Sequence, residues 1–128
     1  MTHLRISECA DLLGVSDDTV RRLVDAGALP VQRDTSGRKV VTGADLAAYV
    51  SAQASEPRER HSSSARNRFR GLVTNVTTDA VMAQVEMQCG SFRVVSLMSA
   101  ESVRDLGLEV GTVATAVIKS TAVIVETR

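Results

Sequence analysis

The chain has 128 residues, a formal net charge of zero and only 2% aromatic residues. This length accommodates one domain or two small ones, and a shift in composition near the middle favours two. The scarcity of aromatic residues means that the cores must be built from Val, Leu, Ile and Ala. The zero net charge argues against a uniformly basic nucleic-acid-binding protein, so any such surface must be local.

Cysteine, histidine and apolar patterns exclude several classes of protein. Cys9 and Cys89 stand alone without a CxxC pattern, and His3 and His61 belong to no ligand spacing. We therefore expect neither disulfide staples nor a zinc site, and a reducing cytoplasmic location fits. No apolar run approaches the about 20 residues of a membrane span, so no membrane partner is expected. No nucleophile–base pair or carboxylate pair stands out, so we expect no enzyme.

The first fifty residues carry the pattern of two short helices joined by a turn. Apolar residues from Ile6 to Leu13 follow helical spacing, with Ser7 as the expected N-cap, and Gly14 interrupts them. Ser16 is expected to cap a second helix with two aspartates in its first turn, and Gly27 to end it in the left-handed conformation. This arrangement predicts a helix-turn-helix.

A basic hairpin is expected next. Residues 31–41 read as two strands with a turn at 35–37, and residues 21–39 hold five basic side chains against two acidic ones. Thr42 and Asp45 predict a capping-box-like start for a third helix. The hairpin would form a basic wing beside the helix-turn-helix.

The pattern of residues 4–50 resembles the winged helix-turn-helix of the excisionase and MerR type. The resemblance rests on Leu13-Gly14-Val15-Ser16, on Gly27-x-Leu29-Pro30 and on the basic hairpin. It implies a second helix at the major groove and a wing on the backbone or minor groove of double-stranded DNA. The residues expected at the DNA are Thr19, Arg21, Arg22, Arg33, Arg38 and Lys39. A solvated helix face or a protein-interaction module is the alternative.

Residues 51–63 have almost no apolar content. They are expected to form a flexible linker whose charges serve solubility. The sequence thus predicts a DNA-binding domain over 1–50, a linker over 51–63 and a second domain over 64–128.

The second domain is expected to be a small barrel. Alternation of apolar and polar residues predicts five strands, and a short helix begins at Ser99 and ends at Gly107. The expected strands cover residues 67–76, 80–89, 92–98, 113–117 and 122–125. Five strands with a helix between the third and fourth predict an OB-like barrel, so the fold class is α+β.

Two segments that bracket this domain offer donors suited to an oxyanion. Ser64-Ala65-Arg66-Asn67 precedes the first strand, and Ile118-Lys119-Ser120-Thr121 follows the fourth. Hydroxyls, cations and small residues with approachable backbone N–H groups are hydrogen-bond donors, and a buried dianion needs compensating positive charge. The start of the short helix adds a dipole suited to an anion.

Residues 64–128 resemble the molybdate-binding Mop domain of the TOBE group. The resemblance rests on Ser64-Ala65-Arg66-Asn67 with Gly71, on Ser99-x-Glu101-Ser102-Val103 and on Ile118-Lys119-Ser120-Thr121. It implies molybdate or tungstate bound at subunit interfaces, and therefore a homo-oligomer: a dimer at least, with the hexamer typical of single-domain members. The residues that it assigns to the oxyanion are Ser64, Ala65 (through its backbone), Arg66, Asn67, Ser99, Ser102, Lys119 and Ser120.

Both halves together suggest a regulator of the ModE type, whose affinity for DNA changes when it binds molybdate or tungstate. An intracellular molybdate storage or buffering protein, with the helix-turn-helix used for tethering or assembly, is the alternative. An excisionase-like architectural DNA binder is a third reading, which leaves the second half without a role. Residue by residue, Ser99 and Ser102 could simply cap a helix, Lys119 could be a surface lysine and Arg66 could pair with an acid.

Overall fold

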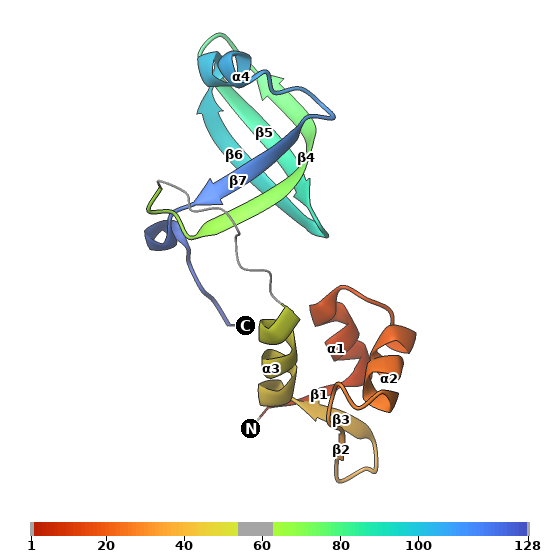
Figure 1. Cartoon of the computed structure of the whole chain (residues 1–128). Coiled ribbons are helices and arrows are strands. Elements are labelled where there is room, and N and C mark those ends of the chain that lie inside the picture. Colours follow the sequence, from red (N-terminus) through yellow and green to blue (C-terminus); the bar gives the residue numbers. More distant parts are fainter. Residues whose placement is uncertain (1, 54–62, 128) are drawn as a thin grey trace. The chain divides into compact units, whose positions relative to one another are not determined.

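The protein is described by a computed structural model that covers residues 2–53 and 63–127. The chain divides into an N-terminal and a C-terminal unit (Figure 1). Most of the expected linker lies outside the described residues, and its first part, residues 51–53, continues a helix.

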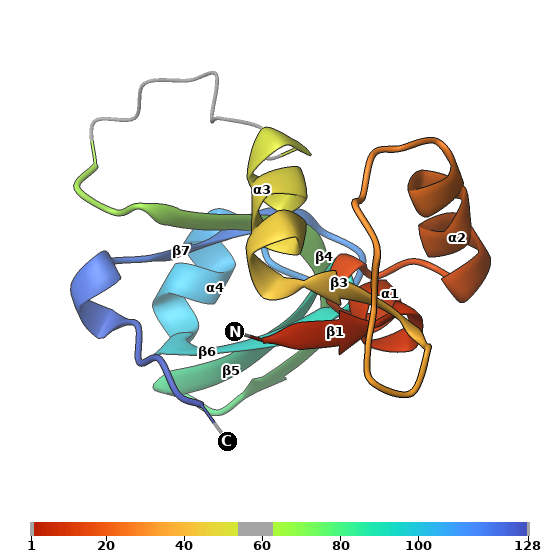
Figure 2. The same ribbon diagram turned by 90° about the horizontal axis from the view of Figure 1, so that it is seen from below.

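The N-terminal unit packs three helices against a small antiparallel sheet. Its elements are β1 (His3–Arg5), α1 (Ile6–Leu13), α2 (Asp17–Asp25), β2 (Gln32–Arg33), β3 (Lys39–Thr42) and α3 (Gly43–Gln53). The strand order is β1-β3-β2, and β1 and β3 lie side by side in Figure 2. The buried core consists of Cys9, Ala10, Val20, Leu29, Val41 and Leu46. All of these are small or aliphatic, as the lack of aromatic residues requires.

Local hydrogen bonds explain where these helices begin and end. Gly14 adopts φ 69° after α1, and the Thr19 N–H donates to Ser16 Oγ at 3.2 Å, so the turn and the cap of α2 are confirmed. The prediction of Ser7 as the cap of α1 is wrong. Arg5 holds the N-cap position, and its backbone N–H donates to Glu8 Oε1 at 3.3 Å.

The third helix begins as the sequence predicts. The Asp45 N–H donates to Thr42 Oγ1 at 3.1 Å, which satisfies one of the free donors of the first turn of α3. Tyr49 lies half-buried against the core, one turn after Leu46. These contacts attach α3 to the sheet.

The C-terminal unit is a curled antiparallel sheet with one short helix. Its elements are β4 (Asn67–Thr78), β5 (Met82–Cys89), β6 (Phe92–Ser99), α4 (Ala100–Leu106), β7 (Val113–Ile118) and a 3-10 turn, η1 (Ser120–Ala122). The strand order is β6-β5-β4-β7, with α4 at one end of the sheet (Figure 1). The buried core consists of Val73, Ala83, Val85, Met87, Cys89 and Val103.

A close approach between β4 and β5 depends on Gly71. A Cβ at this position would overlap the backbone oxygen of Gln88 and would stand 2.6 Å from Cys89 Sγ. The register between the two strands then shifts between Val73 and Asn75. A bulge of this kind increases the local twist and bends β4 around the core.

The prediction of a fifth strand over residues 122–125 is wrong for the single chain. In residues 63–127 the sheet has four strands, and the chain after η1 pairs with none of them. Val123 is 44% exposed, Ile124 84% and Val125 87%. The alternating apolar pattern of a strand is present, but a strand also needs a partner edge and a surface to pack on.

Candidate functional site

Pairing of β4 with β7 brings the two bracketing segments together. Asn67 lies opposite Ile118, and its side-chain amide donates to the Ile118 carbonyl at 3.2 Å. Residues 64–66 precede this pair and residues 119–120 follow it, so the two halves of the expected site meet at one end of the sheet (Figure 1).

The charged and hydroxyl groups at this end face solvent. Ser64, Arg66, Lys119 and Ser120 are exposed, whereas Ala65 is buried. The Ala65 N–H donates to Ser63 Oγ at 3.1 Å. The Arg66 guanidinium is 3.4 Å from the Ala65 carbonyl. Among residues 2–53 and 63–127, neither Arg66 nor Lys119 forms a salt bridge, so within these ranges the two cations have no acidic partner.

Ser99 and Ser102 lie elsewhere on the sheet. Ser99 on β6 pairs with Met82, the first residue of β5. This end of β5 lies beside Thr78, the last residue of β4. Asn67 is the first residue of β4, so it lies at the opposite end of that strand. The Ser99 hydroxyl donates to Ser102 Oγ at 2.7 Å and accepts the Ser102 N–H at 3.1 Å. Both hydroxyls therefore take part in the cap of α4, and one chain does not bring them to the other six residues.

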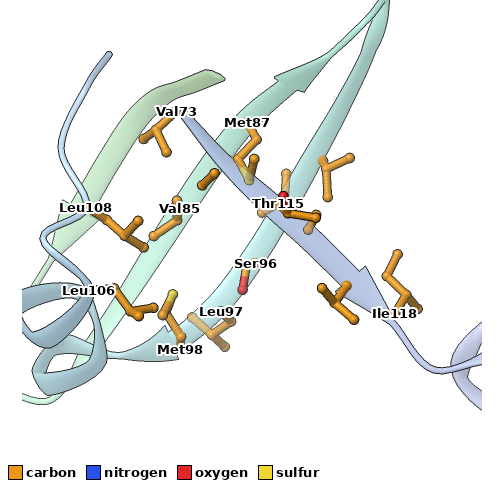
Figure 3. A pocket seen from close by; sticks show the side chains of 15 residues that line it. Val73, Val85, Met87, Ser96, Leu97, Met98, Leu106, Leu108, Thr115 and Ile118 are labelled. Atoms are coloured by element: carbon orange, nitrogen blue, oxygen red, sulfur yellow. The ribbon is translucent and has the colours of Figure 1, made fainter. Parts of the chain in front are cut away.

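A cavity of about 440 Å³ opens between β6 and β7. Its lining is aliphatic, and Ser96 and Thr115 carry the polar side chains among the residues in Figure 3. Val85, Leu108 and Ile118 are typical of the rest. An aliphatic lining does not compensate the charge of an anion, so this cavity is distinct from the expected oxyanion site.

In the N-terminal unit, helix α2 and the β2–β3 hairpin each contribute a cationic side chain to one small surface pocket. Arg21 and Lys39 line one small pocket together with Asp25. Arg21, Arg22 and Lys39 are exposed, and Arg21 makes an ion pair with Asp18 at 3.0 Å on the surface of the helix. Thr19 is half-buried and its hydroxyl lies 3.0 Å from Ser16 Oγ, so this side chain takes part in the cap.

The turn of the hairpin is organised by its own polar side chains. Asp34 Oδ1 accepts the backbone N–H groups of Ser36 at 2.8 Å and Arg38 at 2.9 Å, and the Arg33 guanidinium donates to the Gly37 carbonyl at 2.7 Å. The bonds from Arg38 first, and then from Ser36, hold the pKa of Asp34 below its ordinary value. Arg33 thus shapes the turn that presents the cations after it.

Sequence reasoning missed His3 and Arg5. Both line an open cavity with Arg33, because β1 joins the edge of the hairpin sheet. A strand of three residues is too short to show a periodic signal. Their position beside the hairpin is therefore not visible in the sequence pattern.

The described residues form neither a metal-binding cluster nor a membrane-spanning helix. In the described ranges, no group of three or more His, Cys, Asp or Glu side chains is placed to hold a metal ion. In the same ranges, no helix is long and apolar enough to cross a membrane.

The fold and these sites define a chain with a helix-turn-helix unit followed by a curled antiparallel sheet unit. Residues 4–54 match the helix-turn-helix domain family, and residues 63–125 match the TOBE domain family. The chain belongs to the TOBE domain family and carries a helix-turn-helix domain ahead of that domain. The expected helix-turn-helix of the first unit and the expected TOBE-group domain of the second are thereby confirmed.

Relatives with known names match the second unit. Molybdenum-pterin-binding protein 3 of Clostridium pasteurianum is 45% identical over 63 residues, which cover 48% of this chain and 93% of that protein. A probable molybdenum-pterin-binding protein of Haemophilus influenzae is 41% identical over 63 residues, covering 48% of this chain and 91% of that protein. The structure of a molybdate-binding protein from Sporomusa ovata shares 30% identity with a TM-score of 0.51, covering 52% of this chain and all of that one.

Proposed function

We propose that this chain is a DNA-binding regulator that responds to molybdate or tungstate. The observation that carries the proposal is the pairing of Asn67 with Ile118, which places residues 64–66 beside residues 119–120. The names of the relatives, molybdenum-pterin-binding and molybdate-binding proteins, support the choice of ligand. A cytoplasmic location is part of the same proposal.

The chemistry of this end of the sheet suits a tetrahedral dianion. Molybdate near neutral pH accepts hydrogen bonds and donates none, so its site must be made of donors. Arg66 and Lys119 supply two positive charges, which match the charge of the ion, and Ser64 and Ser120 supply hydroxyls. Asn67 holds the two segments together through its bond to Ile118.

The remaining donors require a second copy of the chain. Ser99 and Ser102 lie at the far end of β4 from Asn67, and this strand has 12 residues. Its ends are up to about 36 Å apart at ordinary strand rise, so a small ion at one end does not reach the other. We infer that each oxyanion lies between copies, with residues 64–67, 119 and 120 from one and Ser99 and Ser102 from the next.

The exposed tail and the open cavity favour the same assembly. Val123, Ile124 and Val125 are exposed after η1, and the apolar cavity between β6 and β7 is uncovered. Each of those two strands has one edge without a strand partner in the described sheet. Docking the tail of one copy as a strand at the cavity of the other would bury apolar side chains worth about 1.5–3 kcal/mol each. The homo-oligomer is therefore a dimer at least.

For the N-terminal unit we propose a winged helix-turn-helix that binds double-stranded DNA. Helix α2 would enter the major groove, and the β2–β3 hairpin would follow the backbone. The adjacency of Arg21 and Lys39 supports this, since cations from both elements then face one surface. Thr19, Arg22, Arg33 and Arg38 complete the proposed interface.

Oxyanion binding would regulate DNA binding by a population shift. An ion that bridges two copies stabilises one arrangement of the dimer, and that arrangement sets the spacing of the two helix-turn-helix units.

An alternative function is molybdate storage, which is favoured by one observation: the named relatives are matched over nearly their full length by the second unit alone.

Two measurements test the proposal. Calorimetric titration with molybdate, tungstate and sulfate, with the oligomer mass measured in the same buffer, should show tight binding of the two larger ions and weaker binding of sulfate. A gel shift with duplexes selected from a random pool should then change when molybdate or tungstate is added. Tight oxyanion binding without any selected duplex would favour storage, and no oxyanion binding would contradict both functions.

A further inference from the structure

Three arginines occupy alternate positions in the sequence along the start of β4 and the segment before it. Arg68 lies opposite Val117 and Arg70 opposite Thr115, and Arg66 precedes them with the same parity. Gly71 and Val73 occupy the positions that alternate with these arginines along β4. Val73 is fully buried, and Gly71 approaches the backbone of β5. Because successive side chains of a strand point to opposite faces, Arg68 and Arg70 share the outer face of the sheet, and Arg66 directly precedes the strand.

This row of positive charge has no acidic neighbour across the strand pair. The residues opposite Arg68 and Arg70 are valine and threonine. The salt bridges in the described part of the chain join Arg21 with Asp18 and Arg93 with Glu86, so they leave the row out. Like charges held on one face repel one another, and an anionic partner removes that cost.

The proposed oxyanion site accounts for only one end of the row. Arg66 directly precedes and Lys119 directly follows the pair of Asn67 with Ile118, whereas Arg70 lies opposite Thr115, four positions before Lys119. At ordinary strand rise this separation is about 13 Å, which is more than one tetrahedral ion spans. Arg68 and Arg70 therefore need a longer anion.

We propose that Arg68 and Arg70 form a second DNA-contacting surface, which binds phosphates of the backbone. Residues two apart on a strand stand about 6.8 Å from each other, so each guanidinium meets its own phosphate. Arginine binds phosphate through two parallel hydrogen bonds, and it keeps its charge at any physiological pH. This surface rests on the proposed function, since it assumes that the helix-turn-helix unit brings DNA to the chain.

The salt dependence of DNA binding tests this surface. Full-length Arg68→Gln, Arg70→Gln and the double variant are compared with Arg104→Gln, which removes the same charge from an exposed position on α4. Affinity for a duplex selected by the wild-type chain is measured by fluorescence anisotropy across a series of KCl concentrations. The slope of log K against log salt should fall by about 0.9 for each arginine removed from the row, and should stay at the wild-type value for Arg104→Gln.

A conservative variant and an oxyanion titration separate this role from others. Arg70→Lys should keep the wild-type slope, because the charge remains, and molybdate affinity should be unchanged in Arg68→Gln and Arg70→Gln. If the wild-type chain binds DNA but Arg68→Gln and Arg70→Gln give the same salt slope as Arg104→Gln, this inference is overturned and the proposed function stays intact. Weakened molybdate binding would overturn it by assigning the row to the oxyanion site. A wild-type chain that selects no duplex would overturn the proposed function together with this surface.

Discussion

The side-chain amide of Asn67 donates a hydrogen bond to the backbone carbonyl of Ile118, and this 3.2 Å bond joins positions 51 residues apart in the sequence. Asn67→Ala removes the donor, so we expect a loss of about 1 kcal/mol in the free energy of unfolding. Because the bond also aligns residues 64–66 with residues 119–120, molybdate binding should weaken. Chemical denaturation and calorimetry measure the two effects.

A control lies on the same strand. Asn75 is exposed, and Asn75→Ala should leave oxyanion binding unchanged. If Asn67→Ala lowers stability but leaves molybdate affinity at the wild-type value, Asn67 has only a structural role.

The sequence predicts features that are decided within a few residues. Gly14 and the Ser16 cap are confirmed because a left-handed turn and a side-chain acceptor are local requirements. The start of α1 differs from the prediction because β1 leads directly into the helix and places Arg5, rather than Ser7, at its N-cap.

Features that depend on distant neighbours are harder to predict. The apolar alternation of residues 122–125 is that of a strand, but nothing in the pattern says whether the same chain offers an edge for it. The sequence likewise groups Ser99 and Ser102 with residues 64–67 as one set of donors. The register of the sheet separates them, and only a second chain would reunite them.

The contact between Gly71 and the Gln88 backbone gives a second prediction. Gly71→Ala places a Cβ against a backbone oxygen and close to Cys89 Sγ, so β4 and β5 must separate. We expect a loss of about 1–3 kcal/mol, the usual cost of overpacking. In Gly43→Ala the new Cβ would meet Thr2 at an ordinary 3.5 Å, and alanine favours a helix, so that variant should be neutral or more stable. Equal melting temperatures for the two variants would show that the strands tolerate the separation.

The carboxylate of Asp79 gives a third prediction, which concerns pH. Backbone N–H groups of Met82 and Val81 both donate to Asp79 Oδ1 at 2.8 Å, and they hold the pKa of Asp79 below its ordinary value. The pKa is lower in the folded state than in the unfolded state. The contribution of Asp79 to stability is therefore present above about pH 4 and is lost as the pH falls through the lower, folded value.

Asp79→Asn should thus be less stable than the wild type at neutral pH, and the difference should narrow in acid. Denaturant unfolding at neutral pH and below about pH 4 measures it. Asp105→Asn, at an exposed position on α4, is the control. A difference between Asp79→Asn and the wild type that stays constant with pH would contradict this account.

The turn of the β2–β3 hairpin gives a fourth prediction, in which two effects have opposite signs. Asp34→Ala removes a negative charge beside the proposed DNA surface, and charge alone would strengthen DNA binding. The same change removes the acceptor of the Ser36 and Arg38 N–H groups, so the turn of the β2–β3 hairpin loses the bonds that shape it. We expect the second effect to dominate and DNA affinity to fall. Asp25→Ala removes a charge of the same sign from α2 and should leave affinity unchanged or raise it. Stronger binding by Asp34→Ala in an anisotropy titration would show that the turn has no such role.

The two lysines of the chain, Lys39 in the N-terminal unit and Lys119 in the C-terminal unit, give a matched pair of variants. Both side chains are exposed, so neither substitution to alanine should change the melting temperature by more than a surface change normally does. Lys119→Ala removes half of the positive charge proposed for the oxyanion, and molybdate affinity should fall by about tenfold or more, as expected for a charge-assisted hydrogen bond. Lys39→Ala should weaken DNA binding and leave molybdate affinity unchanged. Loss of oxyanion binding in Lys39→Ala, or wild-type binding in Lys119→Ala, would place the oxyanion somewhere other than the end of the β4–β7 pair.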